Sequence, residues 1–139
     1  MRNLAKTLTI STSRPGLLEI TREVRQWVEA QSLETGLLTM FCRHTSASLL
    51  IQENAAREVR TDIETFFTEL VPEDPGRYAH DDEGPDDMPA HLRTALTGVQ
   101  LSIPIVAGEL ALGRWQAIYL FEHRYRPHQR EVVLHLLGE

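Results

Sequence analysis

The chain has 139 residues, with 14 Lys and Arg side chains, 20 Asp and Glu side chains and a formal net charge of −6. Five carboxylates lie within the eight residues from His80 to Asp87, and the other 15 nearly balance the basic side chains, so we expect no nucleic-acid-binding surface. The length predicts one domain, residues 1–139, with a substantial core. Cys42 is the only cysteine, which excludes an intramolecular disulfide and a cysteine-rich zinc site.

The N-terminal segment lacks the apolar stretch of a signal peptide, and no apolar run reaches membrane-spanning length. We therefore expect a soluble, cytoplasmic protein without a membrane partner. Lys6 is the only lysine and lies in a predicted strand, which argues against Schiff-base chemistry.

Hydrophobic periodicity predicts three elements in the first third of the chain. Alternation over residues 4–12 is typical of a strand, and helical spacing over residues 21–35, before Gly36, predicts a helix. Residues 37–51 form a long extended segment, apolar at both ends and polar at its centre.

The clearest helix follows this segment. Asn54 is its expected N-cap, and Pro72 ends it. Its apolar stripe consists of Val59, Ile63, Phe66, Phe67 and Leu70.

The acidic stretch of residues 78–91, YAHDDEGPDDMPAH, is the most distinctive part of the chain. Gly84-Pro85 predicts an irregular loop, after which Asp87 is the expected N-cap of a short helix over residues 88–97. Gly98 closes that helix. The side chains expected to face inward are Met88, Leu92, Ala95 and Leu96.

The last third has the pattern of strands. Residues 101–105 alternate, with Pro104 indicating an edge or a strand end, and residues 115–122 and 131–137 are apolar on both faces, as in buried central strands or strands covered by a partner. Strands with interspersed helices predict an α+β fold with a mixed or antiparallel sheet.

Three histidines are candidate metal ligands: His44, His80 and His91. They come from different elements, so sequence spacing neither supports nor excludes a shared site. At a helix N-terminus the dipole disfavours imidazolium, which keeps His91 neutral and able to ligate. A structural histidine at the margin of the apolar stripe is the alternative for His91, and a solvated acidic loop is the alternative for the carboxylates.

The segment HTSAS interrupts an apolar stretch with three hydroxyl groups and an imidazole. In strand geometry His44, Ser46 and Ser48 share one face, which can hydrogen-bond phosphate or sugar oxygens. An ordinary exposed strand face is the alternative. The chain has no GxSxG motif, which argues against a serine hydrolase, and Cys42 fits a small buried hydrophobe.

Residues 123–130 contain a cluster of basic side chains that can bind an anion. A solvated hairpin is the alternative interpretation of this cluster. Glu122 is unusual in so apolar a strand, since a buried carboxylate needs a partner. Arg124 on the same face is one candidate partner, and a metal ion is the other.

The sequence resembles the YjbQ-like family over nearly its whole length. The matching motifs are HTSAS (44–48), EN (53–54), residues 78–91, LSIP (101–104), LALGRWQ (110–116) with Glu122 after it, and the terminal LLGE. The Trp-Gln pair, followed by Gly in the family, is followed here by Ala117.

The resemblance implies an α+β protein with a β-sandwich-like core and two to three helices that assembles as a homotrimer. It also implies a secondary thiamine-phosphate synthase activity, a transferase reaction that releases diphosphate. We expect a divalent metal, zinc or magnesium, on His44, His80 and His91, with His44, Asp86 and Asp87 as catalytic candidates. The substrate-binding candidates are Thr45, Ser46, Ser48, Asn54, Trp115, Gln116, Glu122 and Arg124.

These observations favour a metal-dependent enzyme acting on a small phosphorylated metabolite. Two other classes fit the same residues: a non-catalytic oligomeric module that binds a metal or an anion, and an interaction protein whose polar loop caps a subunit interface.

Overall fold

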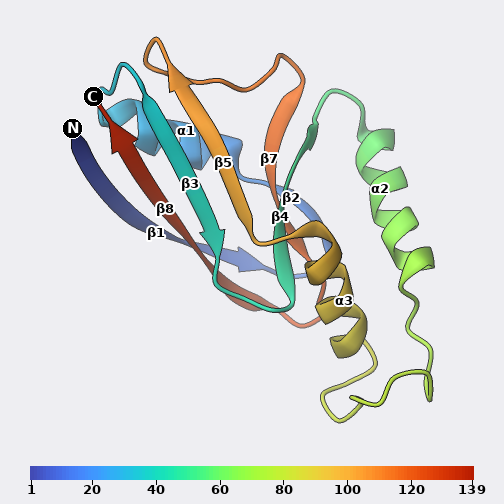
Figure 1. Ribbon diagram of the computed structural model, residues 1–139. Helices are drawn as coiled ribbons and strands as arrows, with labels where there is room; N and C mark the ends of the chain where they lie inside the picture. The colour runs from blue at the N-terminus through green and yellow to red at the C-terminus, as the bar shows by residue number, and fades with distance from the viewer.

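The computed structural model describes residues 1–139, which form eight strands and three helices (Figure 1). The strands are β1 (Arg2–Thr12), β2 (Gly16–Glu19), β3 (Gly36–Cys42), β4 (Ala47–Glu53), β5 (Gln100–Val106), β6 (Glu109–Leu110), β7 (Gln116–Glu122) and β8 (His128–Gly138). The helices are α1 (Thr21–Ala30), α2 (Arg57–Leu70) and α3 (Asp87–Thr97).

The strands form two antiparallel sheets. The larger has the order β1-β8-β3-β5-β6 and the smaller the order β2-β7-β4. Every strand pair is antiparallel. The prediction of an α+β fold with a sandwich-like core and two to three helices is confirmed. No helix combines the length and the apolar character needed to cross a bilayer.

One apolar core joins the two sheets and α1. Leu38 and Met40 of β3 and Leu120 of β7 are fully buried in it, together with Val24 and Val28 of α1. A buried side chain of this size contributes about 1.5–3 kcal/mol. The alternation of strand residues therefore sets which face of each sheet points to the core.

The other face of β7 is covered within the same chain. Ala117, Tyr119 and Phe121 form a second buried cluster, and Ile63 and Phe67 of α2 pack against it. This arrangement explains why residues 115–122 are apolar on both faces: β7 is the central strand of the smaller sheet and lies between the core and α2.

The predicted extended segment, residues 37–51, is wrong as one element. The chain turns at residues 43–46, and β3 and β4 on either side belong to different sheets. His44 and Ser46 therefore lie in the turn and do not share a strand face with Ser48. The polar residues were the signal for a turn.

Two helix boundaries also differ from prediction. Helix α1 ends at Ala30 and the chain turns at Ser32, with φ 56°, before Gly36 opens β3. Helix α2 begins at Arg57 after Ala56, so Asn54 is not its N-cap. No residue of α2 is buried, because the helix contacts the smaller sheet along only part of its apolar stripe.

Helix α3 buries a different face from the one its apolar residues predicted. Its N-cap is Asp86, without a side-chain capping bond, and Asp87 is its first residue. Leu96 is 61% exposed. The residues that are buried include two charged side chains: Asp87, Pro89, Ala90, Arg93 and Thr94. The buried face of α3 is largely polar, which is unusual for a packing helix.

Candidate functional site

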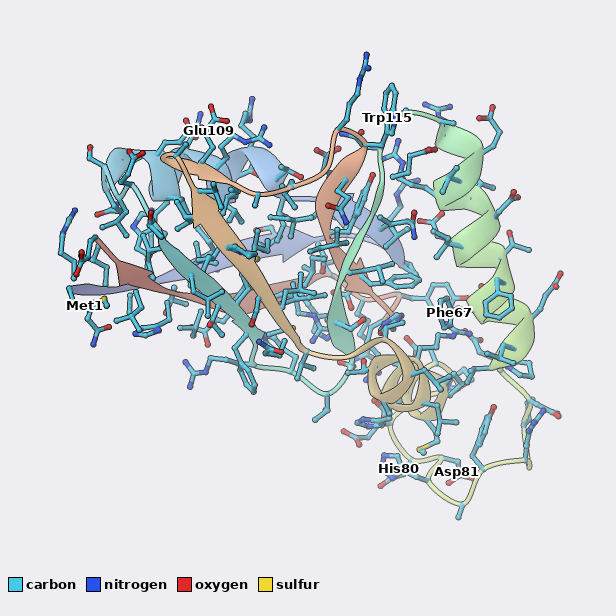
Figure 2. All side chains as sticks on the ribbon, turned by 45° about the horizontal axis from the view of Figure 1, so that its top comes forward. Met1, Phe67, His80, Asp81, Glu109 and Trp115 are labelled. Atoms are coloured by element: carbon cyan, nitrogen blue, oxygen red, sulfur yellow. The ribbon has the colours of Figure 1, made fainter.

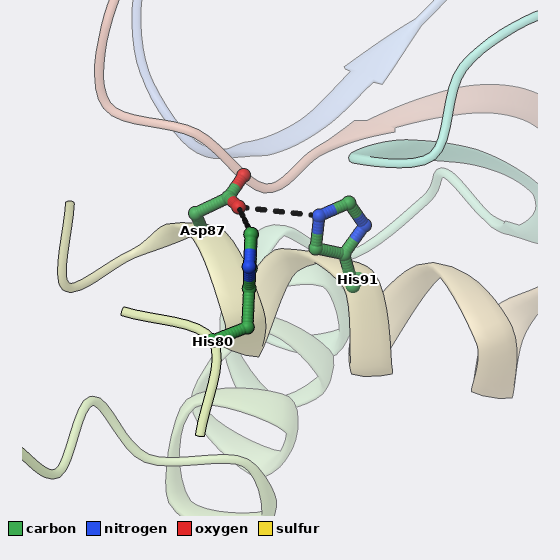
Figure 3. Close-up of side chains that lie close together, drawn as sticks. All are labelled: His80, Asp87 and His91. Carbon is green, nitrogen blue, oxygen red and sulfur yellow. Dashed lines mark hydrogen bonds and ion pairs between the residues drawn. The ribbon is translucent and has the colours of Figure 1, made fainter. Parts of the chain in front are cut away.

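The acidic loop folds back over the first turn of α3, so that His80 of the loop and His91 of the helix both face the carboxylate of Asp87 (Figure 3). His80 Nε2 lies 2.9 Å from Asp87 Oδ2, and His91 Nε2 lies 3.2 Å from the same oxygen. Asp87 and His91 are one helical turn apart, so their side chains share a face of α3. We call His80, Asp87 and His91 the triad.

A backbone contact orients the ring of His91. Its Nδ1 lies 3.1 Å from the carbonyl oxygen of Thr45, which can only accept a hydrogen bond. Nδ1 therefore carries the proton, and in the neutral ring Nε2 presents a lone pair toward Asp87. Two acceptors then face each other at 3.2 Å, a geometry that calls for a proton or a cation between them.

His80 reaches the triad from the loop and has further carboxylates around it. Its Nε2 also lies 2.9 Å from Glu83 Oε2, and its Nδ1 lies 3.5 Å from Asp82 Oδ1. The hydrogen bond to Asp87, followed by that to Glu83, raises the pKa of His80 above its usual value.

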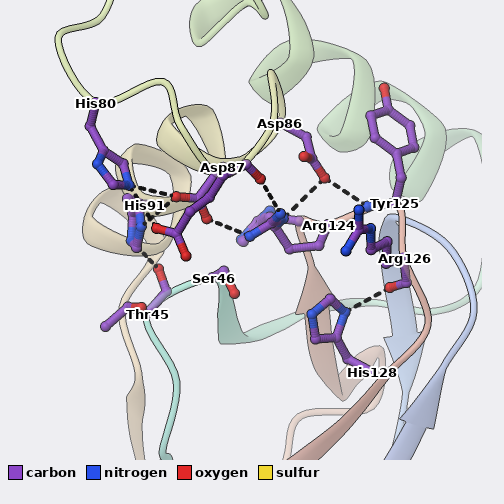
Figure 4. Close-up of polar contacts among 12 residues, drawn as sticks. Thr45, Ser46, His80, Asp86, Asp87, His91, Arg124, Tyr125, Arg126 and His128 are labelled. Atoms are coloured by element: carbon purple, nitrogen blue, oxygen red, sulfur yellow. Dashed lines mark hydrogen bonds and ion pairs between the residues drawn. The ribbon is translucent and has the colours of Figure 1, made fainter.

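Arg124 fixes the two aspartates at the start of α3 (Figure 4). Its Nε donates to Asp86 Oδ2 at 3.1 Å, its Nη1 donates to Asp87 Oδ1, and its Nη2 donates to the carbonyl of Glu83 at 2.9 Å. The Tyr125 backbone N–H donates to Asp86 Oδ2 at 2.9 Å. Both aspartates are therefore held rigidly, and the loop is tied to the end of β7.

The Asp87 carboxylate is nearly buried, with 5% of its side chain exposed. Burial works to raise its pKa, but the hydrogen bond from His80 and the charge of Arg124 outweigh burial and lower the pKa below its usual value. Asp87 is thus ionised at neutral pH. It offers one oxygen to Arg124 and the other to the imidazoles.

The triad has the donor atoms of a metal site. The ligand atoms of His80, Asp87 and His91 all lie within 4.8 Å of one another. Two imidazoles and a carboxylate suit zinc and similar transition metals, whereas magnesium prefers oxygen ligands. The Thr45 carbonyl and Arg124 would orient two of the ligands.

His44 lies outside the triad, so the expectation that three histidines meet is wrong for this chain. The backbone N–H of Glu131 donates to His44 Nε2 at 2.8 Å, which fixes the ring against β8. Burial, together with the charge of Arg130, lowers the pKa of His44. Its place in the triad is taken by Asp87, which sequence analysis had assigned to capping and catalysis.

The hydroxyl groups of HTSAS do not form a common ligand-binding row. Thr45 contributes its carbonyl to His91, and the buried Ser46 accepts from Arg130 Nη2 at 3.0 Å. Ser48 is also buried, with its Oγ 2.9 Å from His123 Nε2. Ser46 and Ser48 therefore serve internal contacts.

The partner of Glu122 is Arg130, and the predicted side-chain pair with Arg124 is wrong. Arg130 Nε donates to Glu122 Oε1 at 2.8 Å, and the Arg124 backbone N–H donates to Oε2 at 3.1 Å. Burial works to raise the pKa of Glu122, but the bonds from Arg130 and Thr12 outweigh it and lower the pKa. This buried ion pair joins β7 to β8.

The remaining predicted site residues lie at the other end of the molecule. Figure 2 shows Trp115 far from His80. Asn54 and Gln116 line a shallow pocket with Arg114 at that end, and the Arg114 guanidinium lies over the Trp115 ring at 4.9 Å. Asn54, Trp115 and Gln116 therefore cannot contact a ligand at the triad of the same chain.

Sequence reasoning missed Asp87 as a partner of His91, although a signal was present. Asp87 and His91 stand at i and i+4, and a helix that starts at Asp87 places both on one face. The assignment of Asp87 to the N-cap concealed this pairing.

The fold and the triad define a small α+β protein with a histidine–carboxylate cluster at the start of one helix. The chain belongs to the family described as UPF0047 protein YjbQ-like, which it matches over residues 6–139. A UPF0047 protein of Synechocystis sp. is 52% identical over 138 residues, which cover 99% of this chain and 94% of the relative. The UPF0047 protein YjbQ of Escherichia coli O157:H7 is 42% identical over 135 residues, covering 96% and 97%.

Solved structures share the same architecture. The crystal structure of a YbjQ-like protein from Sulfolobus solfataricus P2 is similar with a TM-score of 0.86 and 26% identity, covering 99% of this chain and 100% of that one. A hypothetical protein from Aeropyrum pernix K1 gives a TM-score of 0.85 and 31% identity, covering 98% and 99%.

Proposed function

We propose that this protein is a metal-dependent enzyme that acts on a small phosphorylated metabolite. The observation that carries the proposal is the convergence of His80 Nε2, His91 Nε2 and Asp87 Oδ2, with the His91 lone pair directed at the carboxylate. A divalent ion bound there would act as a Lewis acid toward a phosphate oxygen. The Thr45 carbonyl and Arg124 already orient His91 and Asp87, two of the three ligands.

An open basin beside the triad supports a phosphorylated ligand. Its volume is about 480 Å³, and it is lined by three basic side chains, Arg124, Arg126 and His128 (Figure 4), and on the loop side by Asp82 and Glu83. Arg124 is occupied by the aspartates, whereas Arg126 is exposed and forms no ion pair. A free guanidinium next to a metal site suits a phosphate group.

The resemblance to the YjbQ-like family adds a candidate reaction to this proposal. In thiamine-phosphate synthesis a pyrimidine diphosphate is joined to a thiazole phosphate and diphosphate leaves. Arg126 would bind a phosphate of the substrates, and His80, Asp87 and His91 would hold the metal ion.

A non-catalytic metal- or anion-binding module is the second candidate, and one observation favours it. Asp86 and Asp87 both accept hydrogen bonds from Arg124, so neither is a free general base. His44, the other catalytic candidate, is bonded to the backbone of β8. The site thus offers ligands but no obvious proton acceptor.

Metal analysis and turnover separate these functions. Protein purified without a histidine tag should bind one zinc per chain, and the two thiamine precursors should be converted only when the metal is present. Zinc binding without turnover of a panel of phosphorylated metabolites would favour the binding module. Failure to bind zinc or another transition metal would exclude the metal-dependent enzyme and the metal-binding module, and would leave only an anion-binding module.

We also propose that copies of this chain form a trimer. Strand β7, although apolar on both faces, does not supply the interface, since α2 covers its second face within the same chain. The outer face of the larger sheet supplies a better one: Leu37 and Leu137 are direct cross-strand neighbours there, and Leu37, Phe41 and Leu137 are each at least 40% exposed.

Light scattering tests this assembly. The native protein should have the mass of three chains at micromolar concentration, and Phe41→Glu should give the mass of one chain. A monomer mass for the native protein would contradict the proposal.

The single cysteine is consistent with a cytoplasmic location, which we propose on that ground. Cys42 is buried and unpaired, and burial raises the pKa of its thiol to about 11. A protonated, inaccessible thiol needs no disulfide partner.

A further inference from the structure

A separate cavity lies beside α3, α2 and the end of β7. Its volume is about 160 Å³, well above the ~10–15 Å³ that one water molecule needs. Arg93 and His123 line it, together with Glu64 of α2. Arg93 follows His91 by two residues, so it points about 200° around the helix from that triad member. The cavity is therefore distinct from the proposed metal site.

Arg93 is a buried cation without a counterion. It is 8% exposed, its Nη2 donates to the carbonyl of Val71 at 2.6 Å, and its Nε has no hydrogen-bond partner. It forms no ion pair with any carboxylate. Val71 caps the C-terminal end of α2, whose dipole offsets only part of the charge. An unpaired buried charge is costly, so the adjoining cavity suits an anion.

No carboxylate that lines the cavity forms an ion pair with Arg93, and the charges of Glu73 and Asp86 act on it from beyond ion-pair distance. Glu122 is neutralised by Arg130, and burial, together with the charge of Arg93, lowers the pKa of His123 to about 3, so its ring is neutral. Glu64 is the remaining carboxylate, and its Oε2 accepts the Leu17 backbone N–H at 2.7 Å. A ligand in the cavity thus meets the guanidinium of Arg93, which forms no ion pair, the carboxylate of Glu64, and the carboxylate of Glu122, which is paired with Arg130.

Aromatic side chains limit the size of the ligand. Phe67, labelled in Figure 2, and Phe121 both line the cavity, and their rings pack edge to face with centroids 5.7 Å apart. We propose that this cavity binds a small oxyanion, a carboxylate or a phosphate group, through the guanidinium of Arg93. Glu64 weakens the binding of a highly charged anion and favours one that carries a hydroxyl or ammonium donor.

Residue-resolved NMR titration of the full chain tests this site. Inorganic phosphate and acetate are added separately at constant ionic strength. Either anion should cause saturable shifts of the Gly16, Thr68 and His123 resonances at millimolar concentration, and the tighter of the two identifies the preferred group. Shifts confined to the His80 and His91 region, or none that saturate, would overturn the proposal. The result does not depend on the proposed enzyme function.

Two variants provide the controls. Arg93→Gln should weaken binding at least 10-fold, whereas Glu64→Gln, which keeps an acceptor for Leu17, should strengthen phosphate binding several-fold. If Arg93→Gln does not fold, Arg93→Lys preserves the charge and a donor for Val71 and should retain weaker binding. Unchanged affinity in Glu64→Gln and in the folded Arg93 variant would mean an adventitious ion only.

Discussion

Arg124 holds one oxygen of Asp87 and leaves the other oxygen facing both imidazoles of the triad. The two residues are 37 positions apart in sequence, and the ion pair between them is nearly buried. Because Arg124 binds only Oδ1, the position of the Asp87 carboxylate is fixed while Oδ2 keeps a lone pair directed at the imidazoles. The site is therefore built before any ligand arrives, which reduces the entropic cost of binding.

His91→Ala should lower zinc affinity on the order of 100-fold, because it removes one of three protein ligands. The fold should survive, since the ring is only half-buried. Isothermal titration with zinc measures the change, and His135→Ala is the matched control, because His135 lies in β8 and its side chain hydrogen-bonds Asn3 rather than any residue of the triad. Full zinc occupancy in folded His91→Ala would remove His91 from the site.

Arg124→Lys should lower zinc affinity about 10–100-fold, although Arg124 is not a ligand. Lysine keeps the charge but cannot bridge Asp86, Asp87 and the Glu83 carbonyl as the guanidinium does. The same titration applies, with Arg126→Lys as the control, since Arg126 holds neither aspartate. Equal losses in both variants would show that the bonds from Arg124 to the two aspartates do not set the affinity.

Arg130→Met should destabilise the fold by about 3–5 kcal/mol, because it leaves Glu122 buried without its cation. The variant that combines Arg130→Met with Glu122→Gln should recover part of this loss. Urea denaturation measures the free energies of unfolding. The lowered pKa of Glu122 means that its stabilisation is present above the unfolded value of about 4.5 and is lost as pH falls through the folded pKa. A loss below about 1 kcal/mol in Arg130→Met would contradict this assignment.

His123 should make the protein less stable in acid. Its pKa is about 3 in the folded state and 6.5 in the reference state, so below pH 6.5 only the unfolded chain gains the proton. Stability should fall by about 2 kcal/mol between pH 7 and pH 5 from this residue alone. His123→Gln removes the titration, so urea denaturation at the two pH values should show a smaller loss in the variant. Identical losses would place the pKa of His123 near its ordinary value.

Much of the fold was predictable from local pattern. Alternation marked β1 and β5, and the apolar run over residues 115–122 marked a central strand, because core-facing side chains leave a period in the sequence. Gly98 marked the end of α3, where a φ of 96° favours glycine. The family motifs agreed with these elements.

The predictions failed where a residue's partner lies on a different element of the fold. His44 was grouped with His80 and His91 by residue type, but the backbone of Glu131, 87 residues away, occupies its Nε2. Glu122 was paired with its neighbour Arg124, yet Arg130 on the next strand binds it. Local sequence does not record such pairings.

The sequence alone determined the α+β class, the family and the acidic segment that carries His80 and His91. Only the tertiary structure decided that Asp87 joins the two histidines, that Trp115 lies at the opposite end of the folded molecule from them, and that α3 buries Arg93. The physical reason is that the spacing of apolar residues indicates the type of each element and the face that it buries, but not the partners of its polar side chains. The contacts of polar groups depend on where the loop closes against α3 and on which strand ends lie nearby.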